Sequence, residues 1–166
     1  IIQQILKNTL IEKNVFSRIV MEDTVNKKYF STSDMLASLK YAPPSTLFNQ
    51  IEDDATLFVF PTDGFSAFGF VSKIATSSSS NNIMTIMKSW EPNLINDTRE
   101  FGTLLGKTNM VPIANFQQNN YKNNIIRFLT LSPGPDCFGA CYAVANNKFY
   151  FATCCKPITN LIDSSQ

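Results

Sequence analysis

Four cysteines near the C-terminal end constrain the fold of this chain more than any other feature of its sequence. They are Cys137, Cys141, Cys154 and Cys155. Cys141 lies within residues 139–145, Cys154 and Cys155 lie within residues 148–155, and Cys137 lies just before the first range. The alternating side chains of both ranges predict two β-strands. The pair Asn146-Asn147 between these strands tolerates the left-handed backbone of a two-residue hairpin turn. We therefore expect the cysteines to tie the ends of one hairpin together.

Disulfides, reduced buried thiols and a metal site are three interpretations of this cluster. The spacing contains no C-x-x-C motif, which tetrahedral metal sites commonly use, so a metal site is disfavoured. Disulfides are favoured over reduced thiols because the chain is expected outside the cytoplasm, where disulfides persist. A two-residue turn would place Cys141 and Cys154 on one face of the hairpin as diagonal neighbours, a spacing that needs local twist before a disulfide forms. We predict the pairs Cys141–Cys154 and Cys137–Cys155.

The rest of the composition excludes several classes of function. The chain has no histidine, which removes Ser-His and Cys-His catalysis and most zinc-enzyme designs. Its 14 basic and 13 acidic residues give a formal net charge of +1 with no long run of either sign, so nucleic acid is not an expected partner. Charged residues make up only 16% of the chain, and a surface of Asn, Gln, Ser and Thr is common outside the cytoplasm.

Six strands and several helices follow from the apolar patterns. The predicted strands are residues 15–22, 56–61, 65–74, 123–131, 139–145 and 148–155. Helical spacing predicts helices at residues 1–12, around Met35–Leu39, around Leu47–Ile51, at residues 82–105 and at residues 157–163. Trp90 belongs to the apolar stripe of the long helix, which favours a core position over a ligand platform.

The order of these elements predicts the fold class. Strand, helices, strand, strand, helix, strand is the β-α-β-β-α-β order of a ferredoxin-like core, here extended by a C-terminal β-hairpin. We expect an α+β fold in which one antiparallel sheet carries helices on one face. A chain of 166 residues with 44% hydrophobic content suits a single domain, residues 1–166. No apolar run reaches the roughly 20 residues that cross a bilayer. The chain opens on Ile1 in a predicted helix, so any targeting segment is expected upstream of residue 1.

Four short motifs suggest chemistry, and each has a simpler structural explanation. Residues 102–108 are one residue short of a phosphate-binding P-loop and end a helix, where Gly106 is expected to cap it. Residues 52–54 are three acids that suit a solvated loop better than a calcium or acid-base site. The sequon at Asn96 falls inside the long helix, and Cys154-Cys155 lacks the spacing of a redox pair. We predict no catalytic, cofactor-binding or metal-binding residues.

A set of segments along the chain supports a family resemblance. They are residues 16–20, Pro44 with Leu47, Ile51-Glu52-Asp53-Asp54, Trp90-Glu91-Pro92, residues 116–127 with Asn119 and Asn124, residues 142–151 and Ile158-Thr159-Asn160. In these segments the whole chain resembles uncharacterised, single-pass membrane-anchored proteins of very small, genome-reduced and often host-dependent bacteria. The resemblance implies a short cytoplasmic tail, one transmembrane helix and an extracytoplasmic domain. The family pattern lacks the cysteines, and the family carries no assigned activity.

Together these observations predict a non-catalytic, membrane-tethered binding or assembly domain of the cell envelope. The expected place is the extracytoplasmic face of the membrane, and the expected partner is another envelope protein or a second copy of the chain, with no nucleotide or cofactor. A structural subunit of a surface filament or secretion apparatus is the first alternative. The second is a hydrolase that uses only carboxylates, because paired Asp and Glu need no histidine.

Overall fold

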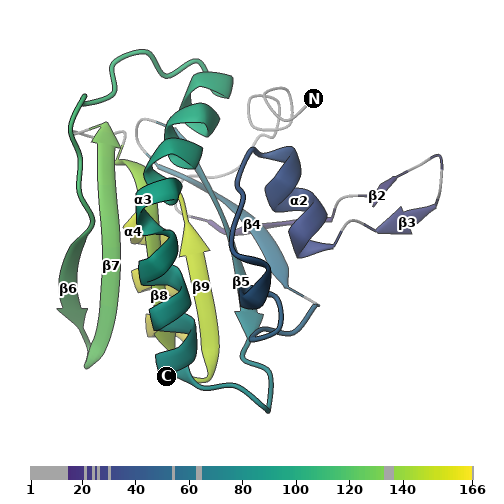
Figure 1. The fold of residues 1–166 in the computed structure, drawn as a ribbon. Coiled ribbons are helices and arrows are strands. Elements are labelled where there is room, and N and C mark those ends of the chain that lie inside the picture. The colour runs from purple at the N-terminus through teal and green to yellow at the C-terminus, as the bar shows by residue number, and fades with distance from the viewer. Residues whose placement is uncertain are drawn as a thin grey trace.

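A seven-stranded antiparallel sheet forms the centre of the protein (Figure 1). The computed structural model describes residues 15–165 except 21, 24, 26, 30, 54, 63–64 and 133–136, so the helix predicted at residues 1–12 lies outside the described residues. In sheet order the strands are β1 (Ser17–Ile19), β4 (Thr56–Pro61), β5 (Ser66–Lys73), β9 (Lys148–Ala152), β8 (Phe138–Ala145), β7 (Asn124–Ser132) and β6 (Gln117–Tyr121). A separate two-stranded hairpin, β2 (Glu22–Asp23) and β3 (Lys28–Tyr29), projects from one side.

This strand order differs from the predicted ferredoxin-like core. A split β-α-β unit inserts one strand between two others. Here β6 to β9 instead form a meander of successive neighbours, and β9 pairs with β5 of the β4-β5 hairpin. The α+β class and the antiparallel sheet are confirmed, and the ferredoxin-like connectivity is wrong.

Helices cover both faces of the sheet, which corrects the prediction that they cover one. The helical elements are α2 (Thr32–Ser38), the 3-10 turn η1 (Ser45–Leu47), α3 (Ser80–Leu104) and α4 (Cys155–Ser164). Leu36 of α2 and Trp90 of α3 share a buried cluster with Phe151 of β9. On the other face, Ile158 and Ile162 of α4 pack in a second buried cluster. The sheet therefore has an apolar core on each side, and Figure 1 shows α3 and α4 on opposite sides of it.

Local sequence signals explain where the helices begin and end. Ser31 caps α2 in a capping box with Asp34, and Ser79 caps α3 by accepting a hydrogen bond from the N–H of Asn82. Gly106, with φ +78°, ends α3 as the sequence predicts. The N–H of Lys107 donates to the Gly102 carbonyl at 2.8 Å, and that of Gly106 to the Thr103 carbonyl at 3.0 Å, which is the Schellman arrangement.

The C-terminal hairpin has the predicted register. Cys141 lies opposite Ala152 and Ala145 opposite Lys148, and both turn residues, Asn146 and Asn147, have positive φ. Trp90 is only 2% exposed, which confirms its core position.

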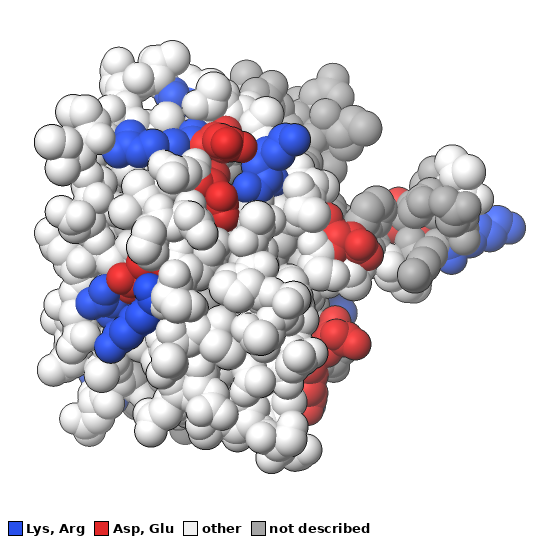
Figure 2. All heavy atoms as spheres, viewed as in Figure 1, with Lys and Arg blue, Asp and Glu red and all other residues white. Residues whose placement is uncertain are grey.

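Charged side chains are scattered over the surface. In the face drawn in Figure 2 they form small groups, several of mixed sign, separated by uncharged surface. No helix within the described residues has the length and apolar character required to span a bilayer.

Candidate functional site

The four cysteines meet at one end of the sheet and form two disulfides, Cys137–Cys154 and Cys141–Cys155. Their Cα atoms lie 5.6 Å and 5.3 Å apart. The prediction that disulfides tie the final hairpin is confirmed, but the predicted pairing of these cysteines is wrong.

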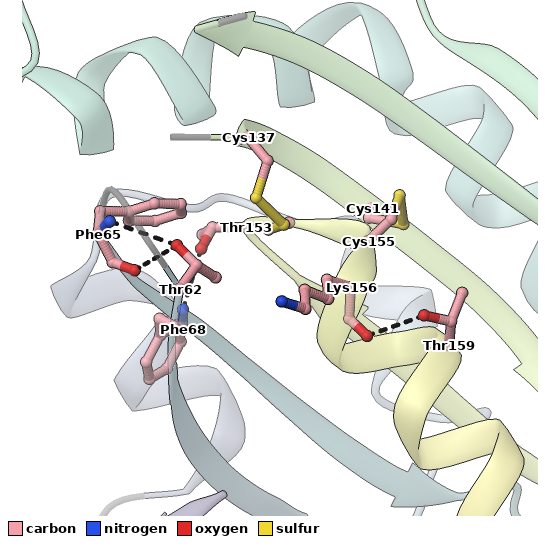
Figure 3. Close-up of a disulfide and its surroundings, with 10 residues drawn as sticks. Thr62, Phe65, Phe68, Cys137, Cys141, Thr153, Cys155, Lys156 and Thr159 are labelled. Atoms are coloured by element: carbon pink, nitrogen blue, oxygen red, sulfur yellow. Dashed lines mark hydrogen bonds between the residues drawn. A yellow bond between two sulfur atoms is a disulfide. The ribbon is translucent and has the colours of Figure 1, made fainter. Parts of the chain in front are cut away.

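The pairing differs because strand β9 ends earlier than predicted. After Ala152 the chain turns at Thr153, whose N–H donates to the Phe68 carbonyl and whose hydroxyl accepts from the Phe68 N–H, at 2.8 Å and 3.0 Å. Cys154 then becomes the residue before α4 and Cys155 the first residue within it. Adjacent cysteines at such a bend no longer alternate between sheet faces, so Cys155 bonds to Cys141, and Cys154 bonds to Cys137 just before β8. Figure 3 shows Cys137, Cys141 and Cys155 around this bend.

A cleft of about 500 Å³ lies beside these disulfides, on the face of the sheet that α4 covers. Helix α4 packs on β8 and β9, which leaves part of this face open towards the sheet edge. Ile126 and Phe128 of β7 contribute an apolar floor, together with Cys141 of β8. The volume is in the range of small-molecule sites, and most of the floor is apolar, as such sites usually are.

One wall of the cleft belongs to the edge strand β6. Gln117, Asn119 and Tyr121 lie opposite Phe128, Ile126 and Asn124 in the register of the sheet. Because alternate residues of a strand share a face, these three side chains project on the α4 side, and Asn119 and Tyr121 line the cleft.

A polar clamp joins this wall to the last turn of α4. The Tyr121 hydroxyl donates to the Asp163 carboxylate at 2.9 Å, and the Lys122 ammonium lies 2.8 Å from the same carboxylate. The hydrogen bond from Lys122, followed by that from Tyr121, lowers the pKa of Asp163. The clamp therefore forms with Asp163 ionised, and it links β6 to α4 at the surface.

The opposite wall is the first turns of α4, where Lys156 and Thr159 line the cleft (Figure 3). Thr159 donates to the Lys156 carbonyl at 2.9 Å. Lys156 is exposed, and its ammonium forms no ion pair with any carboxylate in the described part of the chain. The described lining contains no Asp or Glu, so Lys156 gives this cleft a positive end.

Strand β6 is also one of the two edges of the sheet. The two-residue turn Lys122-Asn123 has positive φ at both positions, so the flanking pair Tyr121 and Asn124 exchanges both hydrogen bonds in the hairpin. Alternation then turns the backbone groups of Gln118 and Asn120 outward, away from β7. The Asn120 N–H, which faces outward, donates to the side-chain oxygen of the neighbouring Asn119 at 2.8 Å.

The edge strand lacks the features that usually protect sheet edges. Natural edges carry lysine, proline or a bulge that discourages pairing with another chain. Gln117–Tyr121 contains no charged residue and no proline, and its register with β7 is unbroken. No other described strand pairs with its outer edge.

A second polar cluster lies on the opposite, α3 face of the sheet. Arg127 of β7 donates to both carboxylate oxygens of Glu91, at 2.8 Å and 2.6 Å, and the Tyr142 hydroxyl donates to the same carboxylate at 2.6 Å. The side chains of Arg127 and Glu91 are 16% and 15% exposed. Burial, followed by the hydrogen bond to Glu91, raises the pKa of Tyr142. These groups satisfy one another, so the cluster fastens α3 to the sheet.

Asp97 forms a comparable link between α3 and the segment after α2. Its carboxylate accepts hydrogen bonds from the Trp90 indole at 3.1 Å and from the Ala42 N–H at 3.0 Å. Partial burial raises the pKa of Asp97.

The remaining sequence candidates are dispersed. Glu52 lies 3.9 Å from Lys73 in an exposed ion pair, and Asp54 lies outside the described residues. Gly106 is part of a helix cap, and Thr98 of the sequon is buried in α3. Among the residues that the structure describes, no three His, Cys, Asp or Glu side chains gather as metal ligands.

Sequence reasoning missed the cleft and strand β6. The strand is polar throughout and shows no apolar alternation, and its turn, Lys122-Asn123, carries the only local signal. The Glu91–Arg127 pair joins residues 36 positions apart, which no local pattern reveals.

Comparison with protein-family models, curated proteins and solved structures found no match to this chain.

Proposed function

We propose that this chain is an extracytoplasmic, membrane-tethered binding or assembly domain without catalysis, and that it recruits a protein partner through the open edge of β6. The partner adds an extended segment to the sheet by backbone hydrogen bonding, a common mode of peptide recognition. The observation that carries the proposal is an exposed edge strand with no charge, proline or bulge.

The two disulfides support the compartment. Disulfides form and persist in oxidising environments and are rare in reducing ones, so they are typical of an extracytoplasmic protein. Tethering by an upstream helix is the part of the proposal that comes from the family resemblance.

The rival hydrolase is less favoured by the site. A carboxylate-only glycosidase needs two carboxyl groups across a cleft, separated by about 5 to 9.5 Å. The described lining of the cleft contains neither Asp nor Glu, and the partly buried Glu91 is paired with Arg127. The filament alternative uses the same edge with a second copy of the chain as the partner.

A photo-crosslinking residue at position 120 tests the proposal in the full-length protein within its own cell envelope. We expect a discrete crosslink to another envelope protein, because the Asn120 backbone faces outward. The matched control is the same crosslinker at Asn146, an exposed residue in the turn of the β8-β9 hairpin.

Two further variants separate backbone pairing from side-chain contact. Gln118→Pro removes an outward N–H and should abolish the crosslink, whereas Gln118→Thr keeps this N–H and should retain it. Crosslinking only between copies of the chain would select the filament alternative. Equal crosslinking from positions 120 and 146, or a crosslink that survives Gln118→Pro, would refute docking at β6.

A further inference from the structure

The cleft beside the disulfides has a chemistry that the proposed partner-binding edge does not use. Its floor is formed by Ile126 and Phe128 with the Cys141–Cys155 disulfide, and its rim carries the amide of Asn119 and the hydroxyl of Thr159. The disulfides link α4 to β8 at one end of the cleft, and the Tyr121–Asp163 hydrogen bond links α4 to β6 at the surface.

The positive charge of Lys156 indicates which head group a ligand of this cleft would carry. Lys156 is the one charged side chain in the described lining, and no described carboxylate pairs with it. An anionic group at the rim would be attracted by the Lys156 ammonium, whereas a cationic group would be repelled by it.

The volume and the apolar floor of the cleft indicate an aliphatic chain as the remainder of the ligand. A methylene occupies roughly the volume of a water molecule, about 30 Å³, so a ten-carbon chain needs about 300 Å³. The cleft of about 500 Å³ has room for one such chain with its head group, but it is too small for the two long chains of a phospholipid.

We infer that the cleft binds a free single-chain anionic amphiphile, with its carboxylate or phosphate at Lys156 and its aliphatic chain over Ile126 and Phe128. The ligand would lie on the α4 face of β6, whereas a partner segment would pair with the outer edge of this strand; the two sites share Asn119, whose side chain accepts from the outward Asn120 N–H.

Binding of decanoate to the oxidised protein, measured by calorimetry, tests this inference. We expect saturable binding that strengthens from hexanoate to octanoate to decanoate, by up to about fourfold for each methylene buried. Decyl phosphate should bind comparably, decylammonium at least tenfold more weakly, and vesicles of phosphatidylglycerol should not compete. Equal binding of the anion and the cation, absence of saturable binding, or competition by the vesicles would overturn the inference.

Two pairs of variants place the ligand in the cleft. Lys156→Met keeps the apolar stem and should weaken decanoate binding about twofold to fivefold, the range for one solvent-exposed ion pair, with little change for decanol. The control is Lys88→Met, because Lys88 is an exposed lysine of α3 on the other face of the sheet. Asn119→Trp should fill the cleft and block binding, whereas Asn120→Trp, on the other face of β6, should not. Unchanged binding by Lys156→Met or Asn119→Trp would refute the location. Crosslinking at position 120 reads out partner docking separately.

Discussion

Reduction of the two disulfides should destabilise the protein by less than twice the effect of one, because the disulfides close nearly the same loop. Cys137–Cys154 and Cys141–Cys155 have sequence separations of 17 and 14. In the chain-entropy treatment, either one alone restricts the unfolded chain by about 3 kcal/mol at 25 °C. Once one has formed, the other closes only a ring of seven residues, 137–141 with Cys154 and Cys155, which contributes about 2 kcal/mol.

The free energy of unfolding should therefore fall by about 5 kcal/mol when the wild-type protein is fully reduced. A variant with one disulfide, Cys137→Ala/Cys154→Ala or Cys141→Ala/Cys155→Ala, should lose about 3 kcal/mol on reduction. Comparing each variant with its own reduced form cancels the packing lost with the side chains.

Equilibrium urea unfolding with and without a dithiol reductant measures these differences. The control is the chain with alanine at all four positions, whose stability the reductant should leave unchanged. A wild-type loss equal to the two single-disulfide losses added together would show that the loops act independently. That result would refute the shared-loop argument, as would a wild-type protein that reduction does not destabilise.

Three more predictions concern stability, each measured by urea unfolding. Arg127→Met leaves the partly buried Glu91 carboxylate without its cation and should lower the free energy of unfolding by about 2 to 4 kcal/mol. The double variant Arg127→Met/Glu91→Gln should recover much of this loss. Equal losses in the single and the double variant would contradict the ion-pair role. Burial raises the pKa of Asp97, so the folded protein binds a proton at this carboxyl more readily than the unfolded chain does. The free energy of unfolding should therefore fall as the pH rises from 3.8 through the folded-state pKa. Asp97→Asn should remove this pH-dependent fall, and a variant with the wild-type pH profile would refute the assignment. Gly139→Ala would overlap the Leu129 carbonyl and should cost about 3 kcal/mol or more, whereas a cost below about 1 kcal/mol would show that β7 and β8 can separate.

Local sequence patterns predicted most of the elements because they depend on neighbouring residues. The strands at 56–61 and 139–145 and the helix at 82–105 lie within two residues of the observed β4, β8 and α3. The turn Asn146-Asn147 gave the correct hairpin register, since two consecutive residues that tolerate positive φ determine it.

Long-range pairing was not predictable in the same way. The position of β9 between β5 and β8 depends on which apolar strands meet, and the alternation of Phe149 to Ala152 suits many neighbours equally. The predicted disulfide pairing was wrong because it assumes that side chains alternate between the sheet faces as far as Cys155. In the structure β9 ends at Ala152 and the chain bends at Thr153. The candidate site follows from this bend and from the polar strand β6, neither of which has an apolar signature.

Residue-resolved hydrogen exchange at β6 tests the central claim of an open docking edge most directly. In the purified full-length protein, the amides of Gln117, Asn119 and Tyr121 face β7 and should exchange slowly, whereas the Gln118 amide faces outward and should exchange quickly. In native membranes, where the partner is present, we expect the Gln118 amide to become protected. A Gln118 amide that is already slow in the purified protein, or one that exchanges equally fast in both preparations, would contradict the proposal that β6 recruits a partner by strand addition.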